Sequence, residues 1–317
     1  MNSIKEVYSK IKYYVKRLNK TIRYVHNKTD NLCVFIFFDI IWCLIRYGST
    51  DNEYRIFKFY NIDGNKRKTY MTKRKYKKYN RKLVDKEIEY ILNDKPLLLA
   101  RLKNYLKRDV YTSGDLSFKQ FEEFAFDSKK VLARSKKNSF LNSFKIYDLN
   151  SFRSPAFMKD QMDKDNLNIV ESFFNQHKSL NCLSDLVIIN IVSVVNKKTI
   201  DLVTSTIKFK DNNKVISGYV DIDSGKVIHN LKDPNGKNYS SDYDGLVVPS
   251  FEKIITLTSV LAKELEEIRQ IEWSYAVNSR GVVYLLDANV WDDYVFTQTP
   301  EFLRNKIGLM SYYKMVK

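Results

Sequence analysis

Two oxygen-bearing side chains in the C-terminal part of the chain have the spacing of a cation site. Asp287 and Asn289 are separated by one residue and follow the β-prone run 282–286. Because successive side chains of a strand point to opposite faces, this spacing places both on one face, within reach of one cation. A carboxylate and an amide oxygen are hard ligands, suited to Mg2+ that bridges nucleotide phosphates. An Asp-x-Asn sequence more commonly forms a turn, so the spacing alone leaves both interpretations open.

The segment that carries these residues predicts a β-hairpin. Two β-prone runs, 273–277 and 282–286, flank a polar turn that ends in Gly281. Alternating β-prone runs joined by a short glycine-containing turn are typical of an antiparallel pair. We therefore expect the candidate cation ligands at the end of the second strand of this hairpin.

Length and composition restrict the class of protein. The 317 residues suffice for one large or two medium domains, and a hydrophobic content of 44% excludes general disorder. Three cysteines and three histidines are scattered without metal-ligand spacing, so neither a zinc site nor a disulfide framework is expected. The odd number of cysteines is typical of a reducing cytoplasm.

The formal net charge of +17 attracts polyanions, among them nucleotides, nucleic acid and anionic lipid surfaces. Within the chain, residues 65–83 hold ten Lys or Arg and no acidic residue, with tyrosines between them. This pattern is typical of a single-stranded nucleic-acid groove, and equally of a solvated helix face. No recognisable nucleic-acid motif accompanies it, so a nucleic-acid partner is not expected.

The N-terminal part of the chain bears on membrane contact. Residues 1–30 predict a basic amphipathic helix, which lies either on an anionic membrane or with one face against a neighbouring helix; we favour the second. The apolar run 32–45 is interrupted by Asp39 and is shorter than the roughly 20 residues that a membrane span needs. It therefore predicts a buried helix. Together these features predict a cytoplasmic protein that at most visits the inner face of the membrane.

Hydrophobic periodicity changes along the chain. Up to residue 125 the pattern is helical and basic, and beyond it strands and helices mix. Strands are expected at 130–133, 144–147, 186–195, 200–209 and 215–222, and an amphipathic helix at 250–267. We therefore expect a helical, basic N-terminal region, 1–125, and a core, 126–317.

The order of short motifs along the chain resembles the sugar-transfer-associated ATP-grasp family, close to its group linked with teichuronopeptide and capsule biosynthesis. The resemblance covers roughly residues 35–300, and it is carried by the order of motifs that are each loose. The matching segments are 39–42, 46–48, 57–60, 67–70, 93–95, 107–109, 129–147, 169–174, 186–194, 213–227 and 271–289.

This resemblance implies an α+β fold, an ATP-grasp-like two-lobed core with an α-helical N-terminal region. It also implies an ATP-dependent carboxylate–amine ligase that uses ATP and Mg2+ to make an acyl phosphate, which an amine converts to an amide. The implied partners are a nucleotide, a carboxylate-bearing sugar or amino acid, and a glycosyltransferase.

The resemblance assigns roles to individual residues of this sequence. Arg134 stands where the family has a phosphate-contacting lysine, and Asn213 at the asparagine before a turn; both are catalytic candidates. In the loop after Arg134, Lys136 and Lys137 are candidates for phosphate contact. Glu171 belongs to the segment that resembles the adenine hinge.

The metal positions of the family are only partly kept. The resemblance assigns Asp287 and Asn289 to the metal, while Ser274 replaces a metal-binding aspartate and Asn190 replaces an arginine. The loop 136–143 has no glycine, although family members close a glycine-rich loop over the phosphates. Three functions therefore stay open: a ligase of weakened activity, a catalytically inactive pseudoenzyme that acts as a scaffold for glycosyltransferases, and a polyanion-binding protein that uses residues 65–83.

Overall fold

The structure is a computed structural model that describes residues 2–84, 86–112, 114–136, 143–196, 199–212, 214–232, 238–240, 243–291, 293–299 and 307–313. By their contacts the residues form two compact units, one of residues 1–82 with 292–317 and the other of residues 83–291. The division that the sequence predicts at residue 125 concerns composition, and it stays a prediction.

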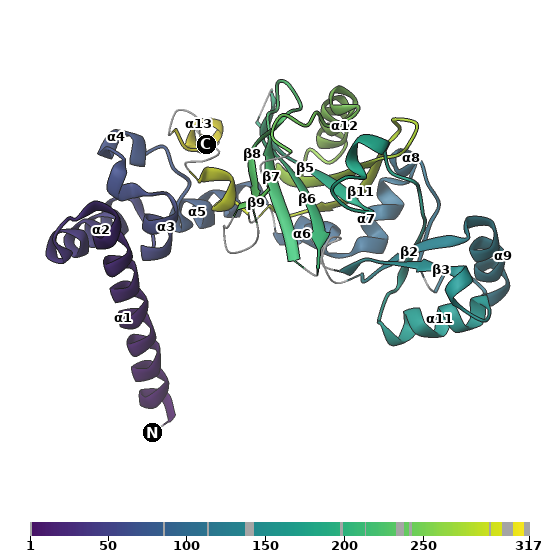
Figure 1. Cartoon of the computed structure of the whole chain (residues 1–317), viewed down its shortest axis with the longest axis horizontal. Helices are drawn as coiled ribbons and strands as arrows, with labels where there is room; N and C mark the ends of the chain where they lie inside the picture. The colour runs from purple at the N-terminus through teal and green to yellow at the C-terminus, as the bar shows by residue number, and fades with distance from the viewer. Residues whose placement is uncertain are drawn as a thin grey trace. The chain divides into compact units, whose positions relative to one another are not determined.

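The first unit is built from helices (Figure 1). They are α1 (Asn2–Thr29), α2 (Cys33–Tyr47), α3 (Asp51–Ile56), η1 (Phe59–Asn61), α4 (Gly64–Arg67), α5 (Lys73–Leu83), η4 (Phe296–Gln298) and α13 (Met310–Tyr313). Their shared core contains five buried aromatic side chains and aliphatic residues of α1 and α2, among them Tyr47, Tyr54, Phe57, Phe59, Tyr70, Ile22, Val25, Ile36 and Ile40.

Local sequence explains where the first helices end and begin. Helix α2 stops at Gly48, whose φ of 69° lies in the left-handed region that glycine adopts without strain. Two residues later, Thr50 and Glu53 form a reciprocal capping box that starts α3. These caps satisfy backbone groups that the helix ends leave without partners.

The prediction that residues 32–45 form a helix is confirmed, but the prediction that this helix is buried is wrong. The segment is helical, but α2 buries only one face, with Ile36, Ile40, Cys43 and Tyr47. The preferred interpretation of residues 1–30, a solvated helix with one face against a neighbouring helix, holds for the C-terminal part of α1, where Ile22 and Val25 are buried; every described side chain from Lys5 to Lys16 is exposed. Among the described residues, no helix is long and apolar enough to cross a membrane.

The second unit combines two sheets with helices, so the predicted mixed α and β fold with a helical N-terminal region is confirmed (Figure 1). Its helices are α6 (Lys86–Asn93), α7 (Lys95–Arg101), α8 (Lys103–Leu106), α9 (Phe118–Ser128), η2 (Leu149–Ser151), α11 (Pro155–Lys164), η3 (Lys178–Leu180) and α12 (Phe251–Glu264).

Every pairing in both sheets is antiparallel. The four-stranded sheet has the order β1 (Val110–Thr112), β4 (Ile169–Ser172), β2 (Lys130–Arg134), β3 (Lys145–Asp148). The seven-stranded sheet has the order β11 (Val283–Asn289), β10 (Gln270–Val277), β5 (Val187–Val195), β6 (Ile200–Asp211), β7 (Lys214–Val220), β8 (Val227–Lys232), β9 (Asn238–Ser240). Strands β10 and β11 form the hairpin that the sequence predicts.

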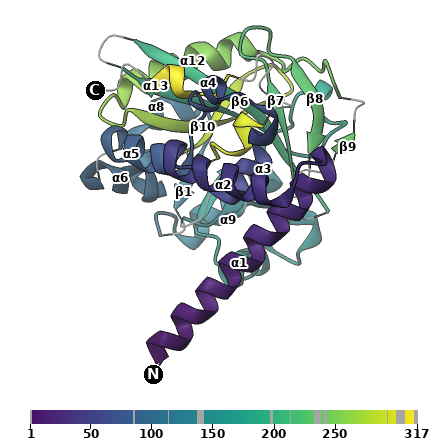
Figure 2. The same ribbon diagram turned by 90° about the vertical axis from the view of Figure 1, so that its left-hand side faces the viewer.

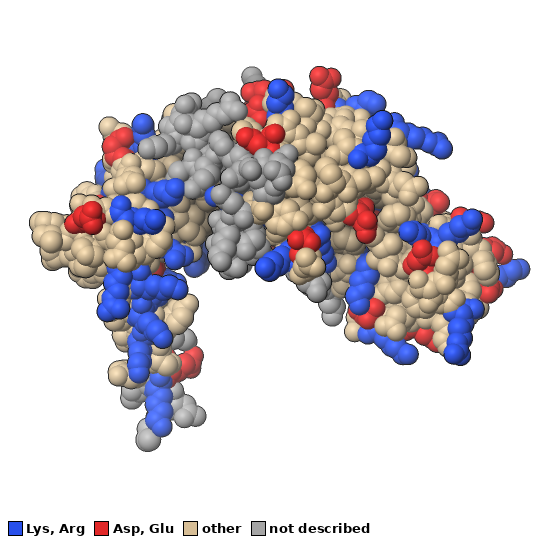
Figure 3. All heavy atoms as spheres, in the orientation of Figure 1, with Lys and Arg blue, Asp and Glu red and all other residues tan. Residues whose placement is uncertain are grey.

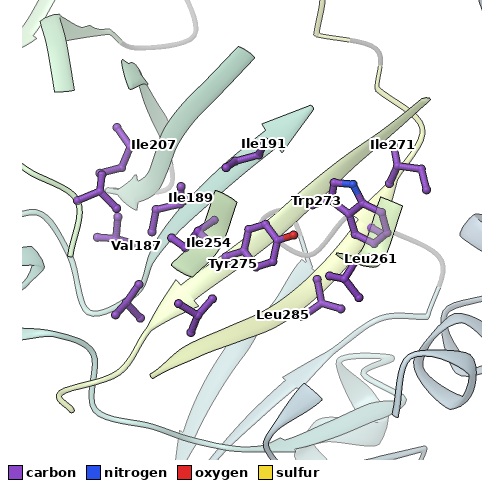
Figure 4. Close-up of a cluster of buried hydrophobic side chains, with 14 of the residues drawn as sticks. Val187, Ile189, Ile191, Ile207, Ile254, Leu261, Ile271, Trp273, Tyr275 and Leu285 are labelled. Atoms are coloured by element: carbon purple, nitrogen blue, oxygen red, sulfur yellow. The ribbon is translucent and has the colours of Figure 1, made fainter. Parts of the chain in front are cut away.

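The two faces of the seven-stranded sheet pack differently. Helix α12 covers one face, where Ile254 and Leu261 meet Trp273, Tyr275 and Ile189 in a continuous apolar core (Figure 4). Side chains of β10 alternate, so Glu272, Ser274 and Ala276 lie on the opposite face. There, Leu132 of β2 packs against Ile188, Ala276 and Leu286, which joins the two sheets.

Candidate functional site

The four-stranded sheet contributes a buried ion pair. Arg134 is the last residue of β2, and Glu171 lies in the neighbouring strand β4. The Nε atom of Arg134 donates to Oε1 of Glu171 at 2.7 Å, and both residues are almost completely buried, with 0% and 1% exposed. Because a charge withdrawn from water needs an opposite partner, each side chain stabilises the other at this position.

The seven-stranded sheet contributes the two candidate metal ligands. Asp287 and Asn289 lie side by side at the end of β11, where Nδ2 of Asn289 donates to Oδ2 of Asp287 at 3.1 Å. Ser274 of β10 pairs directly with Asp287 across the hairpin. Ser274 therefore lies beside the two candidate metal ligands.

Lys95, which carries no predicted role, lies at the centre of these ligands. Its Nζ atom lies 2.9 Å from Oδ1 of Asp287, 2.7 Å from Oδ1 of Asn289 and 2.8 Å from the carbonyl oxygen of Ala288. Its side chain is 4% exposed. An ammonium group therefore lies where the two predicted metal ligands converge.

Arg108 is the second residue that sequence reasoning missed. Its Nε and Nη2 atoms lie 2.9 and 2.5 Å from Oε2 of Glu171, and Nη1 donates to the carbonyl oxygen of Leu285. Both missed residues belong to segments that carry the family resemblance, 93–95 and 107–109. Membership of those segments was the available signal, but it did not show which side chains meet.

These contacts make one network, which we call the ion cluster and define as Lys95, Arg108, Arg134, Glu171 and Asp287. Nη1 of Arg134 lies 3.6 Å from Oδ1 of Asp287 and so links the residues of the two sheets. No side chain of the cluster is more than 4% exposed. Three cations and two carboxylates give the cluster a formal charge of +1.

Burial and the neighbouring charges shift the pKa values of three members of the cluster in opposite directions. Burial raises the pKa of Asp287, but the charges of Lys95 and Arg134 outweigh this and hold that pKa below its ordinary value. Burial lowers the pKa of Lys95, and the charge of Asp287 opposes the shift only in part. For Arg134, the charges of Glu171 and Asp287 outweigh burial and raise the pKa.

The oxygen ligands of the site suit Mg2+ chemically, but their arrangement does not fit a magnesium ion. Lys95 already lies at hydrogen-bonding distance from one oxygen each of Asp287 and Asn289, and a divalent cation cannot occupy the same point as an ammonium group. Among the described residues, no group of three or more His, Cys, Asp or Glu side chains gathers as a metal site would require. Magnesium at this hairpin stays a prediction that needs Lys95 to move.

An apolar layer lies between the two sheets beside Glu171. Its buried members are Leu132, Phe174, Leu186, Ile188, Ala276 and Leu286, and the rings of Phe174 and Tyr284 lie 4.8 Å apart beside them. This layer has the composition that an adenine slot requires. In the structure, the protein's own side chains fill it.

The remaining predicted site residues are placed less centrally. Lys136 is exposed two residues beyond the end of β2. Lys137 and Asn213 lie outside the described residues, as does most of the loop that lacks glycine. Asn190 of β5 lies opposite Ser274, and its Nδ2 atom donates to Oε1 of Glu272 at 2.9 Å.

Comparison with known proteins shows only distant structural likeness. No protein-family model matches the chain, and no curated protein matches it. The chain is similar to D-alanyl-alanine synthetase A from Vibrio cholerae, with 8% identity and a TM-score of 0.44 over 71% of this chain and 64% of that one. It is also similar to an L-amino acid ligase from Bacillus licheniformis, with 8% identity and a TM-score of 0.43 over 72% of this chain and 48% of that one.

A third similar structure is the ATP-grasp ligase PsnB in complex with a minimal precursor, with 8% identity and a TM-score of 0.40 over 66% of this chain and 56% of that one. The chain thus spans less than two thirds of the length of each of these three proteins. A likeness at this level concerns the path of the chain and does not determine its activity.

Proposed function

We propose that residues 83–291 bind ATP between the two sheets and act as an ATP-dependent carboxylate–amine ligase. The observation that supports this proposal is the meeting of Arg134, Glu171, Asp287 and Asn289 at one point, although they come from three strands of two sheets. These are four of the five described residues to which the family resemblance assigns nucleotide and metal contacts; the fifth, Lys136, is exposed.

The ion cluster supplies the charge that such a reaction needs. A substrate carboxylate oxygen attacks the γ-phosphorus of ATP, ADP leaves, and an acyl phosphate forms. An amine then attacks the carbonyl carbon, inorganic phosphate leaves, and the nitrogen loses a proton to give the amide. Cations fixed in a dry site stabilise the phosphate charge during transfer, and Lys95, Arg108 and Arg134 lie together in such a site.

The substrate and the pathway follow from the family resemblance alone. We propose a carboxylate-bearing sugar or amino acid as the substrate and cell-surface polysaccharide synthesis as the setting. Turnover is expected to be slow, because Ser274 and Asn190 lack the charges that the family has at these positions. A glycosyltransferase is the partner that the same resemblance suggests.

A second candidate function is a catalytically inactive pseudoenzyme that acts as a scaffold for glycosyltransferases. The position of Lys95 favours it, because the ammonium of this chain takes up the oxygens that the reaction would need for a metal. In this function the ion cluster stabilises the contact between the sheets and takes no part in catalysis.

Calorimetric titration of the full chain with ATP, with and without magnesium, tests the proposal. The wild type should bind ATP, and Arg134→Met should weaken binding at least about tenfold because a charged hydrogen bond to phosphate is lost. Arg153→Met serves as the control, since Arg153 is exposed and lies outside the cluster. Both variants need a matching thermal melting curve, because Arg134 is buried.

Release of ADP during incubation separates the two candidate functions. Binding followed by slow ADP release on addition of amino acids or sugar acids with an amine supports the ligase. Binding without any release supports the pseudoenzyme. If the folded wild type does not bind ATP at all, nucleotide binding by this chain is wrong in both forms.

A further inference from the structure

Helix α2 carries an apolar stripe on the face that turns away from the core of its unit. The stripe consists of Phe35, Phe38, Trp42 and Ile45, which are 56–65% exposed. Their spacing follows the helical repeat and runs opposite to the buried stripe of α2. A helix that is apolar on all sides is normally buried on all sides, so this exposed stripe needs an occupant.

A basic residue lies at one end of the stripe, and the helix that packs against α2 is basic as well. Nη2 of Arg74 donates to the carbonyl oxygen of Ile45 at 2.9 Å. Arg74 is the second residue of α5, in which seven of the 11 residues are Lys or Arg and none is acidic. Helix α1, which packs against α2 through Ile22 and Val25, has eight Lys or Arg and the single acidic residue Glu6.

The N-terminal half of α1 adds a second exposed apolar face to the same unit. Val7, Ile11 and Tyr14 are 55–57% exposed, and the helical repeat places them on the same side of α1 as the buried Ile22 and Val25. This half of α1 extends away from α2 and α3 in both views of the chain (Figures 1 and 2). Lys and Arg side chains gather along it (Figure 3).

We propose that α2 and the N-terminal half of α1 form a docking surface for an anionic lipid bilayer, with the apolar stripe of α2 inserted at the level of the headgroups. Aromatic and aliphatic side chains on one helix face, next to a basic helix, are typical of helices that lie in the plane of a membrane interface. Trp and Phe partition to this level, and each nearby Lys or Arg is attracted to anionic headgroups.

Charge favours a bilayer over a protein partner as the occupant. Lysine is depleted in protein–protein interfaces, whereas α1 and α5 are rich in lysine and poor in acid. The stripe lies on the membrane and does not span it, because the 15 residues of α2 extend only about 22 Å. A hydrocarbon core is about 30 Å thick. The proposal concerns the first unit and does not depend on the function proposed for residues 83–291.

Trp42 makes the proposal directly measurable. The chain has three tryptophans, and Trp273 and Trp291 are fully buried, so Trp42 is the exposed one. Its fluorescence should shift to the blue when the full chain is mixed with vesicles of phosphatidylcholine and phosphatidylglycerol, and lipids brominated in the upper acyl chain should quench it. Vesicles of phosphatidylcholine alone should bind at least about tenfold more weakly, because the electrostatic attraction is then lost.

Matched variants separate the two sources of attraction by sedimentation with the same vesicles. Phe38→Ser/Trp42→Ser should reduce binding at least about tenfold, because the inserted apolar groups are lost. Phe126→Ser/Phe157→Ser, which changes two equally exposed phenylalanines of α9 and α11, should not. Lys12→Glu/Lys16→Glu/Lys20→Glu should also weaken binding. The control Lys119→Glu/Lys164→Glu/Lys253→Glu alters the net charge of the chain equally at exposed lysines elsewhere.

Each remaining outcome overturns the proposal. If the wild type does not sediment with anionic vesicles, the surface does not dock on lipid. If it sediments but the α2 variant binds as well as the wild type, the stripe is not the contact. If the chain is a dimer without lipid, Phe38→Ser/Trp42→Ser makes it monomeric, and no vesicle binds, then a second copy of the chain is the occupant.

Discussion

Nζ of Lys95 lies 2.9 Å from Oδ1 of Asp287, and both side chains are almost completely buried. The same ammonium lies 2.7 Å from Oδ1 of Asn289. A cation that belongs to the protein thus occupies the point at which the sequence predicts a metal. Because the pair is withdrawn from water, each member depends on the other for stabilisation.

Loss of Lys95 should destabilise the protein strongly. Lys95→Met leaves the carboxylate of Asp287 buried without its closest cation, so the free energy of unfolding should fall by about 3–5 kcal/mol in a urea titration. Lys103→Met, a change at an exposed lysine nearby, should cost less than about 0.5 kcal/mol. The double variant Lys95→Met/Asp287→Asn should lose less than the sum of the single losses. Additive losses would show that the two side chains do not stabilise each other.

Asp287 should make stability depend on pH in the acid range. Its pKa in the folded protein is lowered, so at acid pH the unfolded chain binds the proton more readily than the folded one. The stabilisation from Asp287 is therefore complete above its unfolded pKa, about 3.9, and is lost as the pH falls from there through the lower folded pKa. Urea titrations from neutral pH downward should show the difference between wild type and Asp287→Asn shrinking in that window. Asp160→Asn, at an exposed carboxylate, is the control, and a difference that stays constant with pH would contradict the prediction.

Magnesium should not stabilise the wild type in the absence of nucleotide, because Lys95 holds the oxygens that the ion would need. Lys95→Met/Ser274→Asp removes the ammonium and adds a carboxylate directly across the hairpin from Asp287. Its melting temperature should rise with MgCl2 compared with NaCl of equal ionic strength; saturation at 100 times Kd corresponds to about 2.7 kcal/mol. Lys103→Met/Ser274→Asp keeps Lys95 and should show no such rise. An equal magnesium effect on the wild type would mean that Lys95 does not block the site.

Gly48 should tolerate no larger residue. Its φ of 69° disfavours any side chain, and a Cβ atom there would lie 2.5 Å from Cβ of Arg74. Gly48→Ala should therefore lower the free energy of unfolding by about 2 kcal/mol or more. Gly114→Ala is the matched control, because no heavy atom lies within 4 Å of the added Cβ. Equal melting temperatures for the two variants would show that the turn between α2 and α3 relaxes without cost.

Short-range chemistry made parts of the fold predictable. The hairpin of β10 and β11 is predictable because alternation and a glycine-ended turn are properties of neighbouring residues. The shared face of Asp287 and Asn289 follows from the same strand geometry. The strands expected at 130–133 and 186–195 correspond to β2 and β5 for this reason too.

The sequence by itself determined these local elements and the basic character of α1 and α5. Only the tertiary structure decided that Lys95 meets Asn289, 194 positions along the chain, and that the outer stripe of α2 is exposed. Hydrophobic periodicity reports which faces of a helix are apolar, but not which of them a neighbour covers. Ion pairs between distant elements depend on how sheets and helices pack. A local pattern of residue types does not encode which residues far apart in the sequence come into contact.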